Sequence, residues 1–291
     1  LHRVDRRQRQ MCIRDRDIPI RSQNLDAYAL IIGNEDYASY QTGLAVESNV
    51  PFAIKDAEVF KNYLLNMFQV KEGNVELLLN STYREMNQAF SRLEKIMEVD
   101  GEGKEIIVFY SGHGMPDEEN KDPYLIPVDV SGLNVKEGVS LKEIMNRLSD
   151  KPHKKLTIIT DACFTGAGKK GALAKVRGVT VVPNHPEISE KMVFLASSSG
   201  NESSLTDESR KHGLFTYFLL KYLKESSGNI SIDALFKDVK KSVALEAIKK
   251  FNKSQTPDLI IGKGLLSQKE SLQFFIPVSY THLTLPTIYS V

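Results

Sequence analysis

The feature that most constrains the fold is a repeated alternation between short apolar runs and amphipathic stretches. Residues 27–33 (AYALIIG) are almost wholly apolar up to a closing glycine, which is the pattern of a strand buried on both faces. Residues 51–68 begin with a proline and repeat apolar side chains at helical spacing, so this stretch is expected to be a helix. Such alternation favours parallel strands whose connecting helices cover both faces of the sheet.

The same alternation continues to about residue 262. It predicts further strands and helices; the strands are 74–80, 104–111, 154–162, 191–197 and 257–262, and the helices are 82–99, 139–149, 212–225 and 231–250. About six strands separated by helices make an α/β fold with a mostly parallel sheet. Residues 164–190 contain Gly, Lys and Pro without an apolar pattern, so we expect an exposed loop or linker there.

Both ends of the chain differ from this central region. Residues 1–16 contain six arginines and two aspartates without any periodicity, and residues 277–291 contain no charged side chain. We expect both ends to be non-native and the functional domain to span 17–276. The formal net charge of the chain is +1, which gives no electrostatic argument for nucleic-acid binding. No apolar run approaches the roughly 20 residues of a membrane span.

The number of cysteines limits the roles that a cysteine can have in this chain. If residues 1–16 are excluded, Cys163 is the single cysteine of the domain, and it can form neither an internal disulfide nor a cysteine-based zinc site. This usage fits a reducing cytoplasm, which is the location we expect. A lone cysteine is often a small buried hydrophobe, so its neighbours must distinguish a structural role from a catalytic one.

Two of the predicted strands end in unusual polar clusters. One runs into Ser111-Gly112-His113-Gly114, and the other runs into Asp161-Ala162-Cys163. In open α/β sheets, chemistry gathers beyond the carboxyl ends of the strands, so His113 and Cys163 can meet if their strands are neighbours. An imidazole stabilises a nearby thiolate and moves its proton. The sequence therefore predicts Cys163 as a nucleophile and His113 as its acid/base partner.

A family resemblance extends this prediction. The segments ALIIGNEDY, KDAEVFKNYL, VFYSGHG, ITDACFTG, FLASSSGNES and HGLFTYFLL, in this order, resemble the caspase and metacaspase family over about 27–262. The histidine precedes the cysteine by 163 − 113 = 50 residues, the spacing given for caspases. The resemblance implies a three-layer sandwich with a large-subunit-like part to about 168, a linker at about 164–190 and a small-subunit-like part at about 191–262.

The residues around Cys163 indicate the branch of the family. Animal caspases carry Gln-Ala-Cys-x-Gly, whereas Asp161-Ala162-Cys163-Phe164-Thr165-Gly166 is similar to metacaspases and their bacterial relatives. This resemblance implies an acidic S1 pocket that selects Arg or Lys; its members would be Asp161, Asp56 and Ser111. It also implies an oxyanion hole formed by the backbone N–H groups of Gly114 and Cys163. Charge alone supports the preference, because an aspartate beside the nucleophile attracts a cation.

No third catalytic residue is apparent in the sequence, so we expect a Cys–His dyad. Many metacaspases require calcium, but this chain has Lys136-Glu137 and Lys169-Lys170 where the family has aspartates. Asp129 alone does not provide the six to eight oxygens that calcium takes. We therefore expect no metal site and no required cofactor, with calcium dependence as the alternative.

The linker suggests self-processing. Lys169, Lys170, Lys175 and Arg177 are candidate self-cleavage positions, and solubilising loop charges are the alternative. The expected partners are peptides or proteins with a basic residue before the scissile bond, and neither nucleic acid nor membrane. Two rival functions remain open, namely a legumain- or gingipain-like peptidase of the same fold and a non-catalytic caspase-like signalling or scaffold module.

Overall fold

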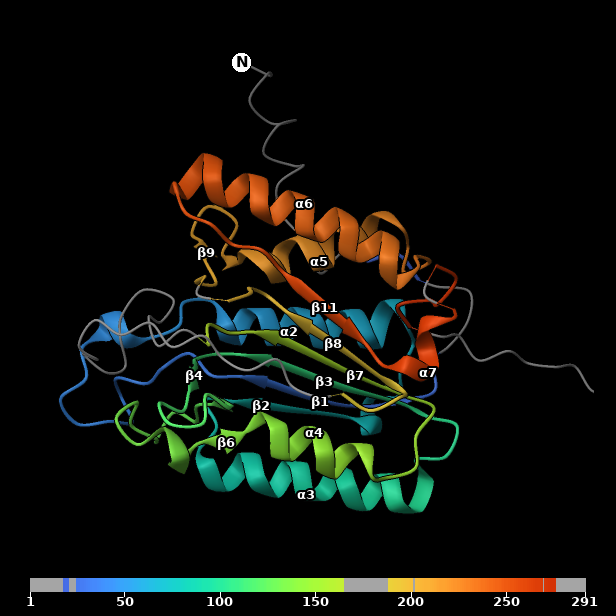
Figure 1. Cartoon of the computed structure of the whole chain (residues 1–291), viewed down its shortest axis with the longest axis horizontal. Helices are drawn as coiled ribbons and strands as arrows, with labels where there is room; N and C mark the ends of the chain where they lie inside the picture. The colour runs from blue at the N-terminus through green and yellow to red at the C-terminus, as the bar shows by residue number, and fades with distance from the viewer. Residues whose placement is uncertain (1–17, 21–24, 165–187, 201, 269, 276–291) are drawn as a thin grey trace, which may run out of the picture.

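The computed structural model describes residues 18–20, 25–164, 188–200, 202–268 and 270–275, and a six-stranded sheet forms its centre (Figure 1). The sheet has the order β11–β8–β7–β3–β1–β2, and only β11 is antiparallel to its neighbour. The six strands are β1 (Ala27–Gly33), β2 (Val75–Leu79), β3 (Glu105–Ser111), β7 (Lys155–Asp161), β8 (Met192–Ala196) and β11 (Asp258–Ile261). The predicted α/β fold with a mostly parallel sheet is confirmed.

Helices cover both faces of this sheet, which confirms the predicted three-layer sandwich. Figure 1 shows α2, α5 and α6 on one side of the sheet and α3 and α4 on the other. Their bounds are α2 (Ala53–Asn62, continued by a π-helical turn at Tyr63–Met67), α3 (Tyr83–Asp100), α4 (Leu141–Ser149), α5 (Leu214–Glu225) and α6 (Ile232–Phe251). Alternate residues of each central strand face opposite layers, so Phe109 packs with α2 and α5 while Val108 packs with α3 and α4.

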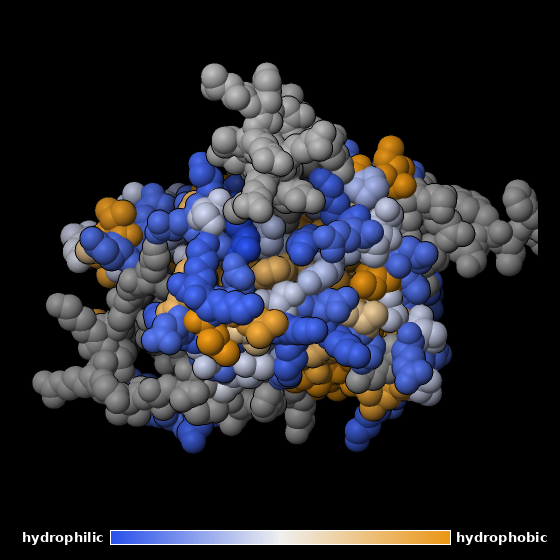
Figure 2. Space-filling view, turned by 90° about the horizontal axis from the view of Figure 1, so that it is seen from above, coloured by the Kyte–Doolittle hydropathy of each residue, from blue (hydrophilic) through white to orange (hydrophobic). Residues whose placement is uncertain are grey.

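Polar side chains fix where several helices begin. Thr82 caps α3 and forms a reciprocal capping box with Glu85. Ser140 and Ser231 cap α4 and α6 by accepting backbone N–H hydrogen bonds from the third helical residue. The outermost helix, α6, buries one side against α5, and the face of the molecule on that side shows hydrophilic residues with separate hydrophobic patches among them (Figure 2).

Short elements that periodicity did not predict lie beyond the carboxyl ends of the central strands. An antiparallel sheet follows β3 and consists of β4 (Gly114–Pro116), β5 (Pro123–Leu125) and β6 (Val139–Ser140). A two-stranded hairpin, β9 (Thr206–Asp207) and β10 (His212–Gly213), precedes α5. The remaining elements are 3-10 turns at Val46–Ser48, Glu72–Asn74 and Val135–Glu137 and a last helix, α7 (Lys263–Leu266). No helix in the described ranges is long and apolar enough to span a membrane.

Candidate active site

The two predicted catalytic residues follow neighbouring parallel strands. The strands β3 and β7 are paired along their length, and their register sets Ser111 opposite Asp161 at the carboxyl end. His113 and Cys163 each follow two residues beyond that pair. The expectation that these strands are neighbours is therefore correct, and both residues leave the sheet at the same edge.

A second contact joins the two loops one residue further on. The ring of Phe164 lies so close to Gly114 that a Cβ added to this glycine would stand 2.6 Å from Cε1 of Phe164. Any larger residue at position 114 would meet the Phe164 ring, which would have to shift. The absence of a side chain at Gly114 thus lets the two loops pack together.

His113 is held through both its ring and its backbone. Its Nε2 lies 2.7 Å from the backbone oxygen of Ser48, a carbonyl that can only accept, so Nε2 carries a hydrogen. In the neutral imidazole, Nδ1 is then the nitrogen that accepts a proton. The backbone N–H of His113 donates to the Tyr37 hydroxyl at 2.9 Å, and the Tyr110 hydroxyl donates to the His113 carbonyl at 2.6 Å.

Cys163 is buried, with 1% of its surface exposed, and it contacts the chain that follows β8. The backbone N–H of Ser204 donates to Sγ at 2.6 Å, and the thiol lies 3.5 Å from the Ser204 carbonyl oxygen. The Ser204 hydroxyl donates in turn to Asp161 Oδ1 at 2.5 Å. Ser204 therefore connects the predicted nucleophile to a residue of the predicted pocket.

The three residues predicted for the S1 pocket lie together and are buried. Ser111 and Asp161 are adjacent in register and face the side of the sheet that α2 and α5 cover. Asp56 lies in the first turn of α2, and its two carboxylate oxygens accept hydrogen bonds from His212 and from the backbone N–H of Gly213. A Cβ added to Gly213 would stand 2.3 Å from Asp161 Oδ2 and 2.9 Å from Asp56 Oδ2. Gly213 thus lies between the two aspartates.

The backbone N–H of Gly114, predicted as an oxyanion donor, takes no part in the pairing of β4 with β5. In the β4–β5 ladder the Ile126 N–H donates to the His113 carbonyl, and Gly114 lies opposite Leu125. Hydrogen-bonded and non-hydrogen-bonded pairs alternate in an antiparallel ladder, so the N–H of Gly114 points away from β5. The N–H of Gly114 therefore makes no hydrogen bond to β5.

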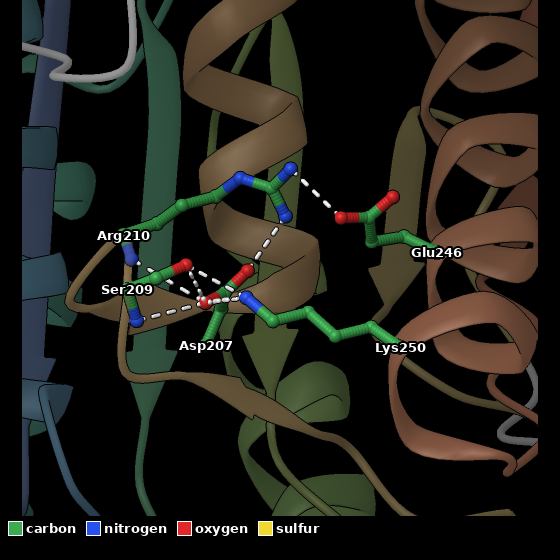
Figure 3. A network of polar contacts seen from close by, with 5 residues as sticks. All are labelled: Asp207, Ser209, Arg210, Glu246 and Lys250. Atoms are coloured by element: carbon green, nitrogen blue, oxygen red, sulfur yellow. Dashed lines mark hydrogen bonds and ion pairs between the residues drawn. The ribbon is translucent and has the colours of Figure 1, made fainter. Parts of the chain in front are cut away.

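The hairpin that carries His212 and Gly213 is tied to α6 by a polar network (Figure 3). Asp207 is buried and accepts hydrogen bonds from Ser209, Arg210 and Lys250, and Arg210 also pairs with Glu246. Burial alone would raise the pKa of Asp207, but the hydrogen bonds from Lys250 and Ser209 and the charges of Arg210 and Lys250 outweigh it and lower the pKa to about 2. The network ties to α6 the hairpin that contacts Asp56, one of the residues predicted for the S1 pocket.

Several site residues were not assigned by the sequence. Ser48 contacts His113, and Ser204 contacts Cys163, through backbone atoms, which carry no residue-type signal. Tyr37 precedes His113 by 76 residues. His212 and Gly213 belong to the motif HGLFTYFLL, but residues 212–225 were predicted as one helix. The helix begins at Leu214 instead, because Asp56 and the β9 strand hold His212 and Gly213 in an extended hairpin.

The residues considered for calcium have other partners. Asp129 accepts a hydrogen bond from the backbone N–H of Tyr83, and Lys136 pairs with Glu119 and Asp117. Within the part of the chain that the structure describes, no group of three or more His, Cys, Asp or Glu side chains is arranged to hold a metal ion. Lys169, Lys170, Lys175 and Arg177 lie outside the described residues, so self-cleavage there stays a prediction.

Comparisons with known proteins place the chain in a family. The model of the caspase domain, a peptidase family, matches residues 26–261. A search of curated proteins gave no match. Among solved structures, protein GSU0716 from Geobacter sulfurreducens superposes with a TM-score of 0.60 at 17% sequence identity, covering 87% of this chain and 100% of that chain. This likeness supports the fold, and the family match carries the assignment: the chain belongs to the caspase domain family.

Proposed function

We propose that the chain is a cysteine endopeptidase that cleaves peptide bonds after Arg or Lys, with Cys163 and His113 as its catalytic dyad. The observation that carries this proposal is the pairing of Ser111 with Asp161, which brings His113 and Cys163 to one edge of the sheet beside two buried aspartates. Membership of a peptidase family supports the reaction class.

The catalytic steps follow from the proton positions. His113 accepts the thiol proton at Nδ1 while its Nε2–H stays on the Ser48 carbonyl. The thiolate attacks the substrate carbonyl, and the N–H groups of Gly114 and Cys163 stabilise the oxyanion, each such donor contributing roughly 3 kcal/mol. His113 then protonates the leaving amine, and a thioester remains on Cys163. Water hydrolyses this thioester, giving up one proton to His113, which returns it to Cys163.

The preference for Arg or Lys rests on the buried charges next to the nucleophile. Asp161 precedes Cys163 by two residues, and Asp56 lies across Gly213 from it. Two carboxylates in a water-poor site attract a guanidinium or ammonium group and repel an acidic side chain. The Ser111 hydroxyl, which has no hydrogen-bond partner among the described residues, adds a polar contact for the same side chain.

Peptide hydrolysis tests the proposal directly. Fluorogenic peptides ending in Arg, Lys, Asn, Asp or Gln should be cleaved fastest after Arg or Lys, and Cys163→Ala should abolish cleavage. Cys12→Ala, which changes the other cysteine of the chain, is the matched control and should retain activity. Hydrolysis that survives Cys163→Ala would overturn the proposed mechanism.

The rival functions predict other outcomes of the same assay. Cleavage after Asn would indicate a legumain-like peptidase. A folded chain that cleaves none of the peptides would indicate the non-catalytic module. Self-cleavage after Lys169, Lys170, Lys175 or Arg177 belongs to the peptidase proposal, because an enzyme of this specificity finds its preferred residues in its own linker.

A further inference from the structure

The acidic pocket is occupied by the protein's own chain. Nδ1 of His212 lies 2.6 Å from Asp56 Oδ1, and the backbone N–H of Gly213 donates to Asp56 Oδ2 at 2.9 Å. On the other side, the hydroxyls of Ser204 and Thr216 donate to the two carboxylate oxygens of Asp161 at 2.5 and 2.6 Å. Both aspartates are fully buried. The donors that a basic substrate side chain would bring are thus already supplied from within.

We infer that His212 is a specificity-determining residue that acts as an internal ligand of the pocket, so that a basic substrate side chain must displace it from Asp56. This inference rests on the proposed function, because it concerns the same pocket. The imidazole presents an N–H donor to a buried carboxylate, which is the interaction that an Arg or Lys side chain makes.

The limited space between the two aspartates supports this inference, in addition to the hydrogen bonds. The gap between Asp56 and Asp161 contains the backbone of Gly213, and even a methyl group there would meet both carboxylates. A guanidinium group cannot contact the two aspartates from that gap while His212 and Gly213 keep their positions. The buried hydroxyl of Ser111, on the strand end next to Asp161, has no hydrogen-bond partner among the described residues. The cluster therefore has capacity for one more polar ligand.

Displacement has a measurable consequence. If only a fraction of the molecules has Asp56 released from His212, the apparent KM for a basic substrate is raised by the inverse of that fraction. Removal of the imidazole should then lower KM for Arg-ended peptides. A peptide ending in Gln makes no charge contact with Asp56 and should gain much less.

The experiment compares His212→Ala with wild type on Arg-ended and Gln-ended fluorogenic peptides. We expect the ratio of the two kcat/KM values to rise about threefold or more, mainly through a lower KM for the Arg peptide. This ratio does not change when part of the protein is unfolded, so lost stability alone cannot produce the result. The control is His153→Ala, because His153 lies near the opposite end of β7, bonded to the Lys151 carbonyl. If His212→Ala folds poorly, His212→Asn can replace it. Asn keeps an N–H donor, so the Arg/Gln ratio of this variant should lie between those expected for wild type and for His212→Ala.

A double-mutant comparison tests the partner. In an Asp56→Asn chain, His212→Ala should change the Arg/Gln ratio by less than about twofold, because the carboxylate that His212 occupies is gone. An unchanged or lower ratio in the single variant, with normal cleavage by wild type, would overturn the inference and leave the peptidase proposal intact. The affinity of the pocket can also be measured without hydrolysis. A labelled Arg-ended peptide is bound to Cys163→Ala and to Cys163→Ala with His212→Ala. If wild type cleaves nothing but His212→Ala strengthens this binding, the peptidase proposal fails and the inference stands; equal binding overturns it.

Discussion

At the scale of single residues, Tyr37 does more than fill the core beside His113. Its hydroxyl accepts the His113 N–H at 2.9 Å and donates to the Ile126 carbonyl at 2.9 Å, so it is inserted into the ladder between β4 and β5. Its ring also lies edge-on to the imidazole, with the centroids 4.6 Å apart. Burial raises the pKa of Tyr37, so the hydroxyl stays protonated at neutral pH and remains a donor.

Tyr37→Phe should therefore impair catalysis more than substrate binding. The ring and its packing remain, but the His113 N–H loses its hydrogen bond to the Tyr37 hydroxyl, which costs about 1–3 kcal/mol when the group stays buried. The Ile126 carbonyl still accepts a hydrogen bond from the Tyr110 hydroxyl at 3.0 Å. We expect kcat for an Arg-ended peptide to fall about tenfold with KM nearly unchanged, because one of the hydrogen bonds that position His113 is lost. Steady-state kinetics with a thermal melt of each variant would measure both effects.

The matched control for Tyr37→Phe is Tyr222→Phe. Its hydroxyl bonds Ser242 at 2.6 Å between α5 and α6, away from the His113 loop. This variant loses a tyrosine hydrogen bond as well, but kcat should not change. An equal fall of kcat in both variants, or none in Tyr37→Phe, would contradict a positioning role for Tyr37.

At the scale of elements, long periodic segments could be predicted from the sequence and short strands could not. The apolar run at 27–33 became β1 with the same bounds, and the helix predicted at 82–99 became α3 because its capping box and apolar spacing agree. The strands β9 and β10 contain two residues each, too few to show a period. Their place is set by long-range contacts such as those of Asp56 and Lys250.

The segment after β11 shows the same limit. No strand or helix pattern was apparent there, yet Phe274 and Phe275 are fully buried. The ammonium group of Lys155, also buried, donates to the carbonyl oxygens of Gln273 and Phe274 at 3.2 and 2.6 Å. Nothing in the sequence indicated that Lys155 bonds these two carbonyl oxygens, because they are backbone atoms more than 100 residues away.

The Asp207 network predicts how stability depends on pH. The folded-state pKa of Asp207 is about 2, below the value of about 3.9 for an unfolded chain. The ionised carboxylate therefore stabilises the fold above about pH 4, and this contribution of about 2 kcal/mol is lost as pH falls towards 2. Asp207→Asn should lower the free energy of unfolding at pH 6, and the difference from wild type should shrink between pH 4 and 3.

Urea denaturation at a series of pH values would check this. Asp150→Asn, at an exposed position after α4, is a suitable control and should change the free energy of unfolding by no more than about 0.5 kcal/mol at any pH. A destabilisation by Asp207→Asn that stays constant from pH 6 to 3 would mean that the charge of Asp207 is not the stabilising feature.

At the scale of the whole molecule, the sequence predicted which strand ends are neighbours better than it predicted the packing around them. The strands β3 and β7 are parallel, so their carboxyl ends lie at the same edge of the sheet. Residue type and strand position therefore sufficed to predict that His113 and Cys163 lie at one edge. What could not be predicted is that residues 204–213 pack on this edge, with Ser204 on Cys163 and His212 on Asp56. That packing depends on how chain segments distant in sequence fit together, and single-residue patterns contain no information on it.

A peptidase specific for Arg and Lys with basic residues in its own chain should cut itself. Purified wild-type chain, incubated at neutral pH, is expected to yield two fragments whose new carboxyl end is Lys169, Lys170, Lys175 or Arg177, as read by intact-mass spectrometry. Cys163→Ala should stay whole.

A dilution series separates cleavage within one molecule, whose fractional rate is independent of concentration, from cleavage between molecules. The same incubation with EGTA or with calcium tests the expected calcium independence. A variant with all four basic residues changed to Gln should remain intact yet cleave Arg-ended peptides; cleavage of Cys163→Ala at the same positions would instead indicate a contaminating protease.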